Sequence, residues 1–144
     1  RIARIFSVFG PQMKRFFIHD FIEKISKEEK SIQLFGTGKQ VRDYLHVDDV
    51  SSGLITIMEN GKAGEIYNLS SGKPTSLVEL SDRIMKILEI DDVKISWDAT
   101  QTVGTRDQWY GDNSKIKEIG FRRKENFDDQ LQSTVREIFS KLIR

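Results

Sequence analysis

The chain has 144 residues, which suits one domain of ordinary size. Its 23 lysines and arginines nearly balance 22 aspartates and glutamates, which argues against a dedicated nucleic-acid-binding protein. The absence of cysteine excludes disulfide scaffolds and thiolate metal sites. No apolar run reaches the roughly 18 residues of a membrane span, so we expect a cytoplasmic protein without a membrane partner.

Apolar periodicity and turn residues predict alternating strands and helices. In chain order the expected elements are a strand at 2–9, a helix at about 14–28, strands at 31–35 and 41–47, a helix at 50–60, a strand at 65–69, a helix at 77–88, a strand at 93–97, a short helix at 113–119 and a helix at 127–142. This order predicts an α/β fold of short mixed strands with flanking helices.

Two helix starts carry their own signals. Asp48 or Asp49 is expected to accept hydrogen bonds from the free N–H groups of the helix that follows. Ser76 and Glu79 have the spacing of a capping box. Residues 98–112 form a polar loop that is long for a compact domain, and we therefore expect it to have a functional role.

The segment Gly-Thr-Gly-Lys at residues 36–39 invites comparison with phosphate-binding loops. A Walker A loop requires Ser or Thr after its Lys and opens a helix, whereas Gln40 follows here and a strand is expected next. The dinucleotide-binding pattern needs a third glycine, but position 41 is Val. Both motifs are therefore rejected, and Gly36 and Gly38 are interpreted as a turn between strands.

Four segments in the same order nevertheless resemble one family. They are RIFSVFGP, IQLFGTGKQVRDYLHVDDV, EIYNLSSGKPTSLVEL and YGDNSKIKEIGF. Together these segments are similar to the C-terminal half of the extended short-chain dehydrogenase/reductases, the NAD-dependent nucleotide-sugar epimerases and dehydratases. The resemblance extends over nearly the whole chain and implies the substrate-binding part of a Rossmann-type fold.

The resemblance also implies that residues 1–144 are a nucleotide-sugar-binding domain, with the NAD-binding Rossmann half absent from this chain. That half carries a glycine-rich loop and a catalytic Tyr-x-x-x-Lys pair in such enzymes. The residues four positions after the three tyrosines are Asp48, Ser71 and Ser114, so the pair is not found here. We therefore expect no catalytic residue in this chain, no activity of the chain alone, and NAD bound mainly by the other half.

Two arginines are the candidates for anchoring the diphosphate of a nucleoside-diphosphate sugar. A guanidinium offers planar, paired donors that fit phosphate oxygens, and the resemblance assigns this contact to Arg42. An ion pair with Asp43 or Asp48 is the alternative for this side chain. Arg106 lies in the polar loop, where the family places a second phosphate-binding arginine, although its spacing differs; a solvated charge is the alternative.

Four further positions are matched to substrate contacts by the resemblance. Gln33 and Phe35 correspond to a strand edge and an aromatic ring that meet the base, and core packing is the alternative for Phe35. Tyr44 is expected to donate to the nucleotide or to fill the core. Ser7 stands where the family usually has Asn, and its single donor leaves the sugar unassigned.

Three functions remain open at this point. The first is the substrate-binding portion of an epimerase or dehydratase. The second is a catalytically silent nucleotide-binding or interaction module. The third is a partly folded fragment with an open sheet edge, which would favour association into a homodimer.

Overall fold

The computed structural model describes residues 1–27, 30–100 and 107–144. The strands are β1 (Ile2–Ile5), β2 (Ser7–Phe9), β3 (Ser31–Phe35), β4 (Val41–His46), β5 (Ile66–Leu69), β6 (Pro74–Ser76), β7 (Lys94–Asp98) and β8 (Gln108–Trp109). The helices are α1 (Phe17–Ser26), α2 (Val47–Asn60), α3 (Leu77–Leu88), α4 (Ser114–Glu118) and α5 (Phe127–Leu142). The expected α/β class is confirmed.

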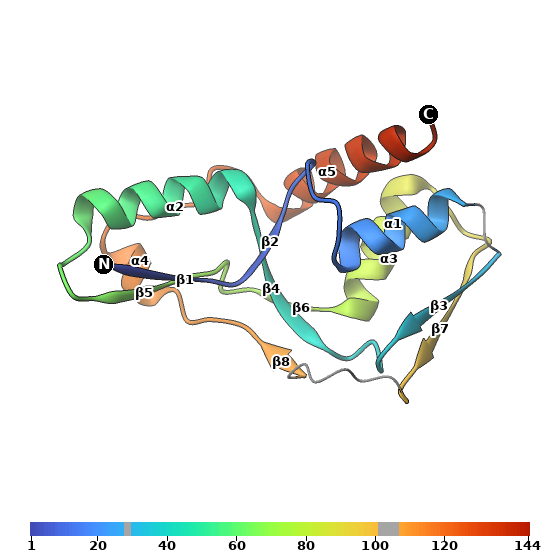
Figure 1. Ribbon diagram of the computed structural model, residues 1–144, viewed down its shortest axis with the longest axis horizontal. Coiled ribbons are helices and arrows are strands. Elements are labelled where there is room, and N and C mark those ends of the chain that lie inside the picture. Colours follow the sequence, from blue (N-terminus) through green and yellow to red (C-terminus); the bar gives the residue numbers. More distant parts are fainter. Residues whose placement is uncertain (28–29, 101–106) are drawn as a thin grey trace.

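The strands form three small sheets rather than one. β1 pairs with β5 and β3 pairs with β7, both in parallel. In the third sheet β4 pairs in parallel with β2 and β8 and antiparallel with β6. β4 runs through the middle of the molecule, between an end built from α2, β1, β5 and α4 and an end built from α1, α3, β3 and β7 (Figure 1).

Each end of the molecule has its own apolar core. The larger core lies between α1, α3 and α5, whose inward residues recur at helical spacing and are buried, as at Phe21, Leu80 and Leu131. The smaller core packs α2 against β5 and the segment after α4, with Tyr67 and Phe121 almost fully buried. β4 contributes to both cores, with Tyr44 in the larger one and Leu45 in the smaller one.

Helix starts follow the sequence signals in one case and depart from them in the other. The hydroxyl of Ser76 accepts from the N–H of Glu79 at 3.2 Å, as expected for a capping residue. The cap of α2 is neither Asp48 nor Asp49 but His46, whose Nδ1 accepts from the N–H of Asp48 at 3.3 Å. The helix begins earlier than expected, so the first aspartates lie inside it.

Several expected boundaries are wrong, because of strand pairing between distant segments or, for α1, because of the local backbone conformation. The strand expected at 2–9 is interrupted at Phe6, because β1 pairs with β5 whereas β2 pairs with β4. β6 and β8 were expected to be loop, and both are ordered by pairing with β4. α1 begins at Phe17 rather than near residue 14, because Phe16 has a left-handed φ of 73° that no helix accommodates.

None of the helices among the described residues combines the length and apolar character needed to cross a bilayer.

Candidate functional site

The pleat of β4 separates its central side chains onto two faces. Successive residues of a strand point to opposite sides, so Arg42 and Tyr44 share one face and Asp43 takes the other. On the first face lies a cavity of about 550 Å³ that Arg42 and Tyr44 both line. Ser7 joins them because the parallel pairing of β2 with β4 sets Ser7 beside Tyr44. Three of the candidate substrate residues therefore meet at one cavity.

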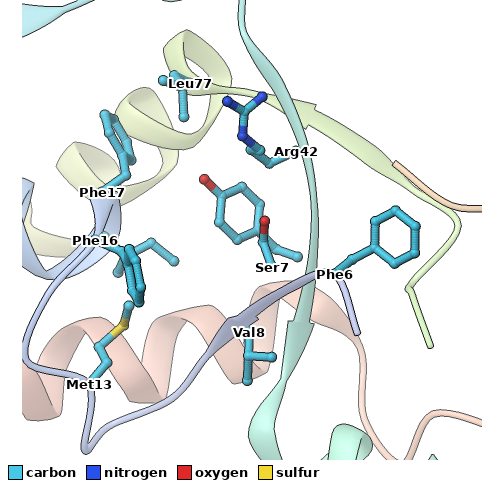
Figure 2. A pocket seen from close by; sticks show the side chains of 10 residues that line it. Phe6, Ser7, Val8, Met13, Phe16, Phe17, Arg42 and Leu77 are labelled. Atoms are coloured by element: carbon cyan, nitrogen blue, oxygen red, sulfur yellow. The ribbon is translucent and has the colours of Figure 1, made fainter. Parts of the chain in front are cut away.

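The wall across the cavity from these polar groups is aromatic. Figure 2 shows Arg42 and Ser7 on the β-strand side and Phe16 and Phe17, from the start of α1, opposite them. Met13 and Leu77 add apolar surface. A cavity with mostly apolar walls and a few polar groups on one side is the usual form of a small-molecule site.

The guanidinium of Arg42 is half-buried and oriented by the backbone. Its Nη1 donates to the carbonyl of Val41 at 2.8 Å and reaches the carbonyl of Asp107 at 3.5 Å. Asp107 lies directly before β8, whose Trp109 is paired opposite Arg42 on β4. The short strand β8 thus brings the end of the polar loop to the arginine.

Asp43 organises the opposite face of β4. Its carboxylate is fully buried and accepts from the N–H groups of Ser71 at 2.6 Å and Gly72 at 3.0 Å, with Gly111 at 3.4 Å. Three loop N–H groups therefore converge on this carboxylate, on the face of β4 away from Arg42. The role of Asp43 as a fixed point for two loops was missed by the sequence reasoning.

Tyr44 is an almost fully buried phenol, 7% exposed. Burial raises the pKa of Tyr44 well above its usual range, and the charge of Arg42 opposes that shift. The hydroxyl therefore stays protonated at neutral pH and can donate a hydrogen bond. The two alternatives weighed for Tyr44 coexist, since the ring is packed in the core and also lines the cavity.

Gln33 and Phe35 do not line the cavity of Arg42; they lie on β3, on its exposed face. The core-packing alternative for Phe35 is wrong, because the ring is 60% exposed. Lys24 of α1 contacts both residues: its Nζ donates to the carbonyl of Gln33 at 2.7 Å and lies 5.8 Å from the centre of the Phe35 ring.

Arg106 falls outside the described residues. Trp109 and Tyr110, which follow it, are 46% and 53% exposed. The Trp109 ring packs on Phe6 with their centres 5.7 Å apart, and Phe6 lines the cavity. Trp109 is thus supported behind the cavity wall.

The glycine turn between β3 and β4 is packed against neighbouring side chains. Gly36 and Gly38 have φ values of 91° and 72°, which explains why glycine is used there. A Cβ at Gly36 would collide with the side chain of Gln40, and one at Gly38 would lie 2.5 Å from Val78. The turn also joins two strands rather than opening a helix, so it is not built as a dinucleotide-binding loop.

The cavity wall contains residues that sequence reasoning had assigned to a helix interior or passed over. Phe16 was placed within an expected helix, yet it is 64% exposed and faces the cavity. Its only signal in the sequence is a pair of aromatic residues directly before an amphipathic helix, a pattern equally typical of a core.

Residues 1–70 match the NAD dependent epimerase/dehydratase family. A dTDP-glucose 4,6-dehydratase from Actinoplanes is 31% identical over 105 residues, which are 72% of this chain and 32% of that protein. The low-salt glycan biosynthesis protein Agl12 of Haloferax volcanii is 29% identical over 136 residues, 93% of this chain and 43% of that protein.

Solved structures agree with these relatives. The UDP-glucose 4-epimerase of Thermotoga maritima, determined with UDP-glucose, has a TM-score of 0.84 at 27% identity and matches 97% of this chain and 46% of its own. The dTDP-glucose 4,6-dehydratase DesIV of Streptomyces venezuelae, determined with NAD, has a TM-score of 0.80 at 30% identity, over 94% of this chain and 42% of its own.

The fold and these matches define a Rossmann-type, extended short-chain dehydrogenase/reductase class of protein. Within that class, the chain is similar to the NAD dependent epimerase/dehydratase family, whose pattern matches residues 1–70. It spans less than half the length of the relatives just described.

Proposed function

We propose that this chain is the nucleoside-diphosphate-sugar-binding portion of an NAD-dependent sugar-nucleotide epimerase or 4,6-dehydratase. One observation carries the proposal: the half-buried guanidinium of Arg42 lines a cavity of about 550 Å³ together with the hydroxyl-bearing residues Ser7 and Tyr44. The relatives whose names include dTDP-glucose and UDP-glucose support this class of substrate.

Arg42 would anchor the diphosphate. Its planar donors match two phosphate oxygens at once, and a partly water-excluded position strengthens the attraction. Ser7 and the protonated Tyr44 add hydroxyl donors on the same wall. Arg106 is proposed as a second anchor from the polar loop. Binding energy gained at the diphosphate would orient the reacting sugar at the far end of the ligand.

Gln33 and Phe35 are proposed to meet the base. Phe35 offers an exposed ring on which a base can stack, and β3 has an edge whose backbone groups can read it. The separation of these residues from the cavity of Arg42 suits a ligand whose base and diphosphate are bound in different places.

When bound, NAD would supply reversible hydride transfer to and from the sugar, the chemistry on which epimerisation and dehydration of a sugar nucleotide depend. The described residues do not form a dinucleotide loop, and no tyrosine of the chain has a lysine four positions on. We therefore propose that NAD and the catalytic pair belong to a separate N-terminal half, and that residues 1–144 alone are inactive.

The surface of α2 supports a second half packed against this chain. α2 buries one face against β5, yet Val47, Leu54, Ile55 and Met58 form a second apolar stripe that is 40–63% exposed. A helix that is apolar on both faces belongs between two layers. β1, beside it, pairs only with β5 among the described residues. We propose that this face carries the NAD-binding half; a second copy of the chain is the alternative occupant.

A catalytically silent nucleotide-binding module remains the second candidate function, since the same cavity would serve it. Both candidate functions require nucleotide binding at this cavity, which calorimetric titration with UDP, dTDP, GDP and CDP tests. At least one of these nucleotides should bind, and Arg42→Ala should weaken its binding. Turnover of the matching nucleotide sugar by this chain together with an NAD-binding half would favour the enzyme, and binding without turnover would favour the module.

A further inference from the structure

The edge of β3 that faces away from β7 presents the backbone N–H and C=O of Gln33. The N–H of Gly36 donates to the carbonyl of Asp98 at 2.8 Å, and the N–H of Lys94 donates to the carbonyl of Lys30 at 3.0 Å. The even-numbered residues of β3 therefore direct their backbone groups toward β7. Because backbone groups alternate along a strand, the N–H and C=O of Gln33 point to the opposite edge. No strand among the described residues pairs with that edge.

One lysine is placed at this edge by two contacts. Nζ of Lys24 donates to the carbonyl of Gln33 at 2.7 Å and lies 5.8 Å from the centre of the Phe35 ring. An ammonium held by a carbonyl and an aromatic ring is fixed more firmly than a solvated surface lysine. The carbonyl takes one of its three donors, so the edge as a whole presents N–H groups: those of Lys24 and that of Gln33.

α1 connects this edge to the cavity of Arg42. Phe17, at the start of α1, lines the cavity, and Lys24 lies seven residues later on the same side of the helix, a rise of about 10 Å. The Phe17 ring stacks on Trp97 of β7, which is paired beside Leu34 of β3. The two places therefore lie along one face of α1, at a spacing suited to an extended nucleotide.

We infer that Lys24 is a specificity-determining residue that selects a base with a keto oxygen at this edge. The inference rests on the proposed function and names its substrate class: uridine, thymidine or guanosine diphosphate sugars in preference to cytidine or adenosine ones. Uracil, thymine and guanine place a carbonyl acceptor where cytosine and adenine place an amino donor. An amino group would meet the N–H groups of Lys24 and Gln33 donor to donor and lose its hydrogen bond with water.

UDP and CDP form the sharpest pair of probes, because uracil and cytosine have the same ring and differ in hydrogen bonding at position 4, a carbonyl oxygen against an amino group, and at the adjoining N3, a donor against an acceptor. Isothermal titration of the wild-type chain should show UDP binding about tenfold more tightly than CDP. Lys24→Met keeps the apolar stem of the side chain and removes the donors, so it should bring this ratio close to one. Lys27→Met is the matched control: Lys27 directly follows α1 and pairs with Glu23 at 3.0 Å, and its loss should leave the ratio unchanged.

The readout is the ratio of the UDP affinity to the CDP affinity of one protein. Partial unfolding of a variant would weaken both nucleotides equally and leave this ratio unchanged. Equal binding of UDP and CDP by the wild-type chain, or an unchanged ratio in Lys24→Met, would overturn the inference. If both nucleotides bind and Arg42→Ala weakens both, the proposed function stands even when the Lys24 test fails. If neither nucleotide binds, the proposed function fails and the inference fails with it.

Discussion

Arg42 and Tyr44 lie two positions apart on β4 and line the same cavity, with a charged guanidinium beside an almost fully buried phenol. The charge of Arg42 lowers the pKa of Tyr44, but the larger effect is burial, which raises it. At neutral pH the pair therefore offers a cation and a protonated hydroxyl on one wall. Both properties suit an anionic ligand.

The first prediction concerns alkaline stability. Because the pKa of Tyr44 is higher in the folded chain, the unfolded state loses its proton first. The stabilising contribution is complete below the ordinary tyrosine pKa of about 10 and is lost as the pH rises from there toward the folded value. Urea unfolding at pH 8 and pH 10.5 should show this loss in the wild-type chain and less of it in Tyr44→Phe. Tyr110→Phe, at an exposed tyrosine, should behave as wild type; equal alkaline losses in all three would contradict the burial argument.

The second prediction concerns the buried carboxylate of Asp43. Asp43→Asn replaces one of its acceptor oxygens by a donor, which leaves loop N–H groups at Ser71 and Gly72 without a full set of acceptors. The free energy of unfolding should fall by about 2 kcal/mol or more, measured by urea denaturation. Asp82→Asn, at an exposed position on α3, should change it by no more than about 0.5 kcal/mol. Equal stabilities of the two variants would show that Asp43 does not hold the loops.

The third prediction isolates the strain at Phe16. Its φ of 73° and ψ of 167° belong to a region that only glycine occupies easily, at a cost on the order of 1–3 kcal/mol for other residues. Glycine would relieve this strain but costs about 0.5–1 kcal/mol in chain entropy. Phe16→Gly should therefore be more stable than Phe16→Ala by about 1 kcal/mol in thermal or urea unfolding. Both variants lose the ring that faces Arg42 and should bind nucleotide more weakly than wild type. A Gly variant less stable than the Ala variant would contradict the strain.

The fourth prediction concerns the outer stripe of α2. Its exposed apolar residues should drive the chain to associate when no other half is present. Ile55→Asp combined with Met58→Asp should give a monomer in sedimentation velocity while helix content stays unchanged, because both side chains are exposed. The paired control Gln132→Asp with Ser133→Asp adds the same two charges at exposed positions of α5 and should leave association intact. A wild-type chain that is monomeric at high concentration would argue against this face as a docking surface.

The sequence alone predicts those helices and strands whose own residues carry a clear apolar pattern. α3 and α5 have long apolar periodicity, and β3 alternates cleanly, so their bounds were predicted closely. It does not predict strands that form only because they pair with another strand distant in the sequence. β6 and β8 are two or three residues long and exist through pairing with β4, which no local pattern can reveal.

The same distinction applies to the candidate site. Arg42 could be selected from its residue type and neighbours, but its meeting with Ser7 depends on the parallel register of β2 on β4. Phe16 at the cavity and Lys24 at the β3 edge were not identified, because an exposed aromatic and a helix lysine carry no distinctive pattern. Their positions follow from how α1 packs, which is a tertiary property.

Nucleotide binding by Arg42 variants tests the central proposal most directly. Isothermal titration with UDP, dTDP, GDP and CDP should identify at least one ligand, and Arg42→Ala should weaken it about tenfold to a hundredfold, since hydrogen bonds to a charged group contribute about 1.5–3 kcal/mol. Arg42→Lys should lose less affinity than Arg42→Ala, and the control Arg136→Ala, on the exposed side of α5, should keep the wild-type affinity. Undiminished binding by a folded Arg42→Ala chain would contradict the account.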